Sequence, residues 1–529
     1  MSDVTIITDP KLSIRFKQLC AVTFDGTYYL AKGYVQDIKL FNEILTLKNK
    51  NILPKQIKEV ICEIEDVANF YQNARSPEIT TDKIRARVQD LLEISARAKA
   101  SDFIIYSCQG TCHFYALVND KRIEICDPWT SSEGELAMEQ IFYAKDEGSK
   151  ETSYKKTDTQ GFSLSPSDDL TLPKNVTKLR AQRGPNHNGF HMVLRLFYVN
   201  TAQDTTLENL GFEPEICEIF KKIQLALSGA VFIAGSTGDG KSTTIATNLK
   251  QQIEAFNGEL QVVTVEDPVE YEIPGAIQIP VSSAANESER EATYTKALMH
   301  FCRIHPATGM VSEIRDGNAG RQVMDMVDTG HQVWTTIHCN SANGILFRLI
   351  DMQINASKLS KPGNIALLMK QTLVPVLCPG CSIKASDEID TLPLWIRKAL
   401  GQSNLVRLRN PKGCQKCHRP DANEISNKVW NGYLRQIAVA EYIEPNNGYL
   451  KFVRDHDPIG AQDYWLNEMG GITLHTKVSK RIHAGTIDPR DAIRKGIIIE
   501  PLHHANSPEV VSLISHPSGD LDVEKESNS

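Results

Sequence analysis

Residues 235–243 read Gly235-Ser236-Thr237-Gly238-Asp239-Gly240-Lys241-Ser242-Thr243, which matches the spacing G-x-x-x-x-G-K-[ST] of a phosphate-binding loop. An apolar strand is predicted just before it, at residues 230–234, and a helix just after it. Glycines let the loop curl so that backbone N–H groups face phosphate oxygens. Lys241 supplies a cation for the β- and γ-phosphates, and the Ser242 hydroxyl can ligate Mg²⁺. A glycine-rich turn is the plainer alternative, but strand, loop and helix in register favour a site for ATP and Mg²⁺.

The sequence around this loop alternates buried strands with helices from residue 207 to about residue 349. Further strands are predicted at residues 261–266, 309–311 and 332–337. Apolar strands separated by helices indicate a parallel sheet covered on both faces, so the fold class is α/β.

Acidic residues and histidines follow these strands, at the edge where open α/β sheets bind ligands. Glu266 is our first candidate for polarising an attacking water and Glu270 the second, and Glu313 is placed to hold a Mg²⁺-bound water. Solvated loop acids are the alternative. His331 precedes the last strand and His338 follows it. A single histidine is often structural, but one beside the phosphates could hydrogen-bond the γ-phosphate.

Two CxxC pairs lie farther along the chain, Cys378 with Cys381 and Cys414 with Cys417. Each pair can form one arm of a tetrahedral Zn–S₄ site, so the sequence predicts one structural Zn²⁺. Unligated thiols are the alternative.

Length and composition limit the class of protein. The chain has 529 residues, of which 41% are hydrophobic and 23% charged, so three or four soluble domains are expected. A net charge of −7 opposes a nucleic-acid partner. We find no export signal and no transmembrane segment, because even the apolar stretch 364–377 is interrupted by Lys370 and Gln371. A cytoplasmic or peripheral protein is expected.

Other elements are predicted from periodicity alone. Helices are expected at residues 54–71, 81–100 and 488–495, and strands at 103–107, 113–118 and 193–197. Residues 131–172 are expected to form a polar loop, 201–207 a hinge, 350–504 mostly helices, and 505–529 a disordered tail.

The motifs resemble those of the secretion and type IV pilus traffic ATPases, in the GspE/PilB branch. In the same order, the stretches similar to the Walker A, Asp box, Walker B and His box are residues 235–244, 266–271, 312–316 and 329–338. The resemblance extends over roughly residues 81–500. It departs from the family pattern before the Walker B strand, where the sequence reads His305-Pro306-Ala307, and at Ser312.

The resemblance implies a RecA-like P-loop ATPase domain, preceded by an α+β, PAS-like domain and followed by a zinc-bearing, mostly helical C-terminal region. The expected divisions are 1–80 (a small N-terminal domain), 81–203 (the α+β domain), 204–360 (the ATPase core), 361–430 (the tetracysteine zinc module), 431–504 (a helical subdomain) and 505–529 (the tail).

The resemblance also implies partners and further site residues. Members form hexamers in which arginines of one subunit reach the nucleotide of its neighbour. Arg180 and Arg195 match those positions, and the further arginines that match near the site are Arg303, Arg315 and Arg348. The two CxxC pairs of this chain resemble the tetracysteine insert of the assembly and secretion ATPases, which the retraction ATPases lack.

The expected function is therefore that of a homohexameric cytoplasmic ATPase, peripheral to the inner membrane. It would power type IV pilus assembly through an inner-membrane platform protein, most similarly to the PilQ-like or BfpD-like ATPases of type IVb and thin pili. The alternatives are a type II secretion ATPase, a DNA-handling P-loop ATPase, and a nucleotide-sensing adaptor with a dead site.

Overall fold

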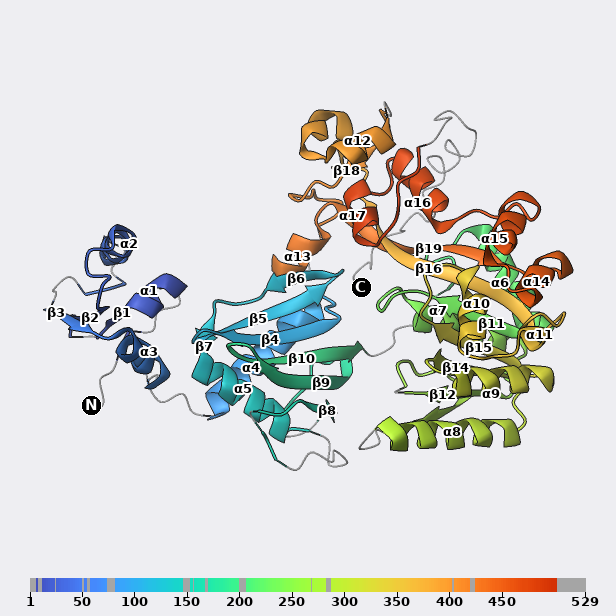
Figure 1. The fold of residues 1–529 in the computed structure, drawn as a ribbon, viewed down its shortest axis with the longest axis horizontal. Coiled ribbons are helices and arrows are strands. Elements are labelled where there is room, and N and C mark those ends of the chain that lie inside the picture. The colour runs from blue at the N-terminus through green and yellow to red at the C-terminus, as the bar shows by residue number, and fades with distance from the viewer. Residues whose placement is uncertain are drawn as a thin grey trace, which may run out of the picture. The chain divides into compact units, whose positions relative to one another are not determined.

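The computed structural model describes residues 6–7, 12–23, 25–49, 52–54, 58–73, 81–145, 153–155, 157–166, 170–198, 206–267, 269–281, 287–401, 404–418 and 424–501 (Figure 1). The chain divides into two compact units, one of residues 1–199 with 419–429 and one of residues 200–418 with 430–529. The predicted tail at 505–529 and most of the predicted hinge lie outside the described residues.

The second unit is built on a seven-stranded sheet of order β13-β12-β14-β15-β11-β16-β19. Five neighbouring pairs, from β13 to β16, run parallel, and β19 joins the edge antiparallel to β16. The strands are β11 (Ala230–Ala234), β12 (Val262–Glu266), β13 (Ala276–Pro280), β14 (Thr308–Ile314), β15 (Gln332–Ile337), β16 (Ile365–Leu377) and β19 (Tyr433–Ile443). The predicted parallel α/β sheet is confirmed.

Helices cover both faces of this sheet (Figure 1). Every residue of β11, β12 and β15 is buried, as expected for strands with a layer of helices on each side. One apolar core packs α6 (Pro214–Ala226) and α7 (Lys241–Ala255) against one face. The opposite core includes α8 (Glu287–Arg303), α9 (Gly317–Asp328), α10 (Gly344–Asp351), α11 (Ala356–Leu359), α14 (Asn447–Arg454) and α15 (Pro458–Asn467).

A third apolar core lies beyond the parallel strands, at the far ends of β16 and β19. It is completed by α12 (Leu394–Leu400), α16 (Leu474–His483), α17 (Pro489–Arg494) and the short pair β17 (Ile383–Lys384) and β18 (Arg407–Leu408), with η2 (Ala385–Thr391) nearby. The predicted helix at 488–495 is confirmed as α17, which Asp488 caps. The expectation of a mostly helical region is wrong for β16 and β19, which pair along most of their length.

The N-terminal part of the first unit has a three-stranded sheet of order β1-β2-β3. Its elements are α1 (Ile14–Leu19), β1 (Cys20–Val22), β2 (Thr27–Ala31), α2 (Ile38–Asn49), β3 (Lys58–Cys62) and α3 (Ile64–Asn73). The helix predicted at 54–71 is half wrong, because Lys58–Cys62 pairs in parallel with β2 and the helix begins only at Ile64.

The rest of the first unit has a largely antiparallel sheet of order β6-β5-β4-β10-β9-β8, with β7 beside β5. Its elements are α4 (Thr81–Arg97), β4 (Asp102–Cys108), β5 (Thr111–Val118), β6 (Lys121–Glu124), β7 (Trp129–Thr130), α5 (Ser131–Tyr143), β8 (Gln160–Leu164), β9 (Val176–Asn186), β10 (Gly189–Tyr198) and, along the chain from 424, α13 (Glu424–Trp430). The predicted polar loop at 131–172 is wrong, since a capping box at Thr130 and Glu133 starts α5 and β8 adds a strand.

Among the residues that the structure describes, we find no helix long and apolar enough to cross a bilayer.

Candidate nucleotide and zinc sites

The P-loop connects the carboxyl end of β11 to the first turn of α7. Gly238 and Gly240 have φ of +84° and +76°, a region that side chains other than glycine rarely adopt, and Gly240 is the N-cap of α7. Four backbone N–H groups of the loop have no acceptor within the described part of the chain. They belong to Gly238, Gly240, Lys241 and Ser242. Such donors at a helix N-terminus can bind an anion such as a phosphate.

The ammonium group of Lys241 folds back onto this loop. Its Nζ atom donates hydrogen bonds to the carbonyl oxygens of Gly235 and Ser236, each at 2.9 Å. Burial lowers the pKa of Lys241, while the charges of Asp239 and Glu313 oppose that shift. The lysine is thus held at the loop by contacts that a phosphate group can replace.

Asp239 fixes the shape of the loop from inside. It is 2% exposed, and its Oδ2 atom accepts a hydrogen bond of 2.8 Å from the backbone N–H of Ser236. Its Oδ1 atom lies 3.1 Å from Thr372 Oγ1 on β16 and 3.4 Å from Lys495 Nζ. Gln371 Nε2 donates to the Asp239 carbonyl at 2.7 Å. Asp239 therefore serves the structure of the loop rather than a ligand.

Glu313 lies at the carboxyl end of β14, where a cluster of charged groups surrounds it. Its Oε1 atom is 2.9 Å from His338 Nε2, which follows β15, and its Oε2 atom accepts a hydrogen bond of 2.6 Å from Arg315 Nε. Arg315 Nη1 is also 3.5 Å from Asp267 Oδ2, which follows β12. Three adjacent parallel strands thus deliver charges to one edge, as the sequence predicts for Glu313, Arg315 and His338.

The two candidate bases differ in exposure. Glu266 is 3% exposed, and its Oε1 atom accepts hydrogen bonds from Thr264 Oγ1 (2.6 Å) and Gln278 Nε2 (2.9 Å). Burial raises the pKa of Glu266, and these hydrogen bonds oppose the shift. Glu270 is exposed, and its charge opposes the lowering of the pKa of Lys241 by burial. Both carboxylates therefore lie at the carboxyl end of β12. That of Glu266 is held in the interior and that of Glu270 is in solvent.

Three predicted residues do not join this cluster. His331 precedes β15, so it lies at the amino end of the strand whose carboxyl end carries His338, and its Nδ1 atom is 3.0 Å from Thr329 Oγ1. Arg303 ends α8 and is exposed, and Arg348 is exposed on α10. Because parallel strands present their carboxyl ends to the ligand, the expected contact of His331 with the phosphates is corrected.

Arg180 and Arg195 face each other across two strands of the first unit. They are direct partners in the antiparallel register of β9 and β10. Arg195 Nε lies 3.2 Å from Asp102 Oδ1 on the neighbouring strand β4 and keeps about half of its side chain exposed. The two arginines therefore form a pair on one face of that sheet.

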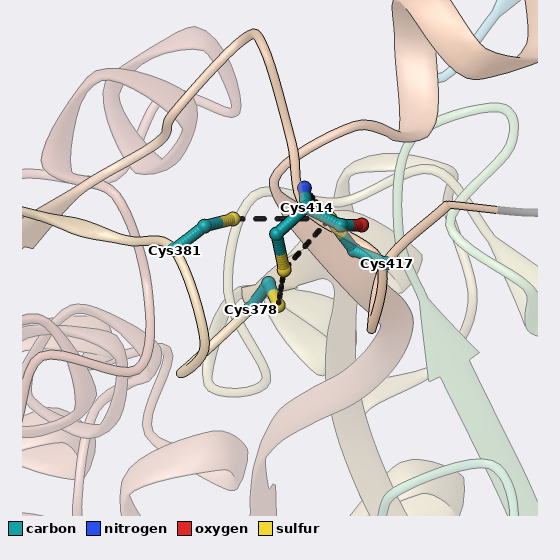
Figure 2. A group of neighbouring side chains, drawn as sticks. All are labelled: Cys378, Cys381, Cys414 and Cys417. Carbon is teal, nitrogen blue, oxygen red and sulfur yellow. Dashed lines mark hydrogen bonds between the residues drawn. The ribbon is translucent and has the colours of Figure 1, made fainter.

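The four cysteines converge on one point (Figure 2). Their sulfur atoms all lie within 4.8 Å of one another, with Sγ–Sγ distances of 3.7 Å (Cys378 to Cys414), 3.8 Å (Cys381 to Cys417) and 3.9 Å (Cys414 to Cys417). A tetrahedron with Zn–S bonds of about 2.3 Å has S–S edges of about 3.8 Å, so the cluster has the size that Zn²⁺ requires. Burial acts to raise the pKa of Cys414, but the backbone N–H groups of Cys417 and Lys416 and the neighbouring thiols lower it to about 7, which favours the thiolate.

Several contacts at the site escape the sequence interpretation. Asp267 follows Glu266 directly, and its place at the end of the same strand is a signal that could have identified it. Tyr271 OH lies 2.8 Å from Thr243 Oγ1 in the first turn of α7, and Tyr294 OH donates to the Glu313 carbonyl at 3.3 Å. Asp267 and Tyr271 lie within the stretch 266–271 that resembles an Asp box, whereas Tyr294 belongs to no recognisable motif.

Comparison with known proteins places these features in a family. Residues 166–442 match the family described as type II/IV secretion system protein. Type II secretion system protein E of Pectobacterium carotovorum subsp. carotovorum is 30% identical over 278 residues, which are 53% of this chain and 50% of that protein. Type IV pilus assembly ATPase PilB of Thermus thermophilus is 33% identical over 242 residues, 45% of this chain and 26% of that protein.

The fold has a counterpart among solved structures. The ATPase DotB of Legionella pneumophila superposes with a TM-score of 0.52 at 18% identity, covering 80% of this chain and 98% of that one. The chain spans about half the length of its type II secretion relatives or less. Since the family match extends over just more than half of the sequence, this chain belongs to the type II/IV secretion system protein family.

Proposed function

We propose that this protein hydrolyses ATP and uses the energy to drive assembly of a type IV pilus, of the type IVb or thin class. The observation that supports it best is the cluster of Glu313, His338 and Arg315 at the same sheet edge as the P-loop. A binding protein needs the loop alone, whereas a carboxylate held between two cationic or protonatable groups beside the phosphates serves hydrolysis.

In this proposal each group has a separate task. Lys241 leaves the carbonyls of the loop to pair with the β- and γ-phosphates, and the free N–H groups of the P-loop bind the phosphate oxygens. Ser242, with Glu313 acting through water, would hold Mg²⁺, which when bound neutralises the developing charge. Glu266, or Glu270 in its place, orients and deprotonates the attacking water, because both lie at the end of the strand next to β14.

The pair Arg180 and Arg195 supplies positive charge to the nucleotide of a neighbouring subunit in a homohexamer. Their adjacency in the sheet of the first unit supports a shared task, and Asp102 holds one of them in place. A cation supplied in trans stabilises the transition state only when the ring is closed, so assembly and hydrolysis become linked.

The cysteine cluster holds one structural Zn²⁺ in this proposal. Four thiolates complete a tetrahedron, so the ion has no open position for catalysis. Its task is to fix the connection between β16 and the segment around Cys414, near where β19 begins.

The working partner is an inner-membrane platform protein, and the chain acts in the cytoplasm, peripheral to that membrane, with no nucleic acid. The pilus assembly relative of Thermus supports this assignment, as do the motifs shared with the pilus ATPases. A second candidate is the motor of a type II secretion system, which the name of the Pectobacterium relative favours. The same proposal includes the domain limits expected from the sequence. It also includes a PAS-like fold for residues 81–203 and a docking role for residues 1–80.

The experiment measures Mg²⁺-dependent ATP hydrolysis by the purified chain and its mass with and without an ATP analogue. We expect ATP turnover from a species of six subunits. Lys241→Ala should lose more than about a hundredfold in turnover, because the phosphates of bound ATP then lack their cation. Thermal unfolding checks that this variant is folded, because it loses only two hydrogen bonds to loop carbonyls. Near-normal hydrolysis by Lys241→Ala would overturn the proposal. Identification of the genes beside this one, for a prepilin or for secretion components, separates the two candidate systems.

A further inference from the structure

Lys370 is a buried cation on β16, the strand beside the P-loop strand. Its residue is only 9% exposed. In the parallel register it lies opposite Ala234, the last residue before the P-loop begins. The next two residues, Gln371 and Thr372, contact Asp239 inside the loop. The backbone at Lys370 is therefore fixed at the base of the phosphate-binding loop.

The acids around Lys370 are already engaged with other groups. Asp239 binds Ser236 N–H, Thr372 and Lys495. Glu441 is the cross-strand partner of Lys370 on β19, yet its two oxygens accept the backbone N–H groups of Ala342 and Leu474, each at 2.7 Å. Among the residues described, the Lys370 ammonium has neither a hydrogen bond nor an ion pair.

A largely buried lysine whose ammonium has no protein partner loses part of its solvation, since burial favours its neutral form. Burial indeed lowers the pKa of Lys370, with Asp239 and Glu441 opposing the shift. The charge of Lys370 also acts to lower the pKa of Lys241. An anion between them would remove both penalties.

The neighbours of Lys370 indicate which part of a nucleotide it would meet. Its cross-strand partner Glu441 accepts the backbone N–H of Ala342, and the segment after β15 that contains Ala342 begins with His338, which contacts Glu313. The ammonium therefore belongs to the region between the base of the P-loop and the candidate hydrolytic cluster. In this region the terminal phosphate of a bound nucleoside triphosphate is the expected group, rather than its base or ribose.

We propose that Lys370 is a second lysine of the phosphate site, which pairs with the terminal phosphate and so distinguishes a nucleoside triphosphate from a diphosphate. This inference rests on the proposed function, because it requires that the P-loop bind a nucleotide. It assigns to Lys370 a task apart from that of Lys241, which serves both phosphates.

The test is an equilibrium titration of the full chain with Mg–ADP and with the β,γ-imido analogue of Mg–ATP. Lys370→Met should weaken binding of the triphosphate analogue by about ten- to a hundredfold, the range of a charge-assisted hydrogen bond, and that of ADP by less than about threefold. Lys370→Arg, which keeps the charge, should retain much of the preference for the triphosphate.

Lys495→Met is the matched control, because its ammonium already pairs with Asp239. This variant should loosen the P-loop and weaken the binding of both nucleotides by a similar factor. Without nucleotide, Lys370→Met should unfold at the same temperature as the wild type or higher, since it removes a charge that has no protein partner and replaces it with an apolar side chain of similar length. If that variant does not fold, Lys370→Gln takes its place in the titration.

Two outcomes would overturn the inference: equal weakening of both nucleotides in Lys370→Met, as in the control, or no change in either. A wild-type chain that binds neither nucleotide would instead refute the proposed function itself.

Discussion

Nε2 of His338 lies 2.9 Å from Oε1 of Glu313, and this contact joins the carboxyl ends of β14 and β15 beside the P-loop. Arg315 binds the other oxygen of the same carboxylate. Glu313 is therefore positioned by protein groups on both sides, and a ligand need not order it.

Glu313→Gln should bind ATP with nearly unchanged affinity and hydrolyse it at least about a hundredfold more slowly. The amide keeps the volume of the side chain and one acceptor, but it loses the charge that holds a metal-bound water. Nucleotide titration and steady-state turnover measure the two effects separately. Glu272→Gln, at an exposed acid between β12 and β13, is the control. A parallel loss of affinity and turnover would mean that Glu313 binds nucleotide rather than promoting its hydrolysis.

Glu266→Gln should change both turnover and the pH dependence of stability. Because burial raises the pKa of Glu266 in the folded chain, wild-type stability falls as pH rises from the ordinary glutamate range through the raised value. Glutamine has no such charge, so the variant should become the more stable protein at neutral pH, with a difference that vanishes in acid. Melting curves across this pH range test the sign.

If Glu266 is also the base, the same variant should lose about 10²–10⁴ in turnover, and the acid limb of the wild-type rate profile should lie above the usual glutamate range. A large loss in Glu270→Gln with little change in Glu266→Gln would assign the base to the exposed acid instead.

Arg195→Ala and Arg180→Ala should leave nucleotide binding by single subunits nearly intact and depress hydrolysis in the ring. Mixing Arg195→Ala with Lys241→Ala subunits should restore part of the activity, since some interfaces then combine an intact P-loop with an intact arginine. Mass measurement must verify that the rings are mixed. Verified mixed rings without any recovery would exclude a role in trans.

Substitution of serine for any one of Cys378, Cys381, Cys414 and Cys417 should lower the zinc content of the chain. It should also destabilise the C-terminal part of the second unit, while basal ATP hydrolysis falls by a smaller factor than zinc content. Metal analysis after purification without chelators should find one zinc per wild-type chain. Cys62→Ser, outside the cluster, is the control and should leave the zinc content unchanged. A wild-type value well below one ion per chain would refute the site.

The sequence predicts the P-loop and the ends of β12, β14 and β15 because these features are local. A strand, a glycine-rich turn and the start of a helix can each be predicted from a few neighbouring residues. The capping box at Thr130 and Glu133 is an equally local signal for α5, and a search for it would have corrected the predicted loop. His331 could likewise have been set aside, because it precedes its strand.

The remainder depends on contacts between distant segments. Residues 364–377 are apolar without a clear period, which suits a buried strand or a buried helix equally well, so β16 is not evident in advance. Its pairing with β19 decides its structure. For the same reason no pattern around Lys370 indicates that its strand lies beside the P-loop.

The contact between Asp239 and Lys495 spans 256 positions of the chain. At about 5–20 residues per second, the ribosome needs roughly 13–50 s to make the intervening polypeptide. Throughout that interval the nascent P-loop lacks the ion pair that anchors its buried aspartate. The last of the contacts that hold Asp239 is therefore a late event of biosynthesis, because it forms only after Lys495 has emerged from the exit tunnel.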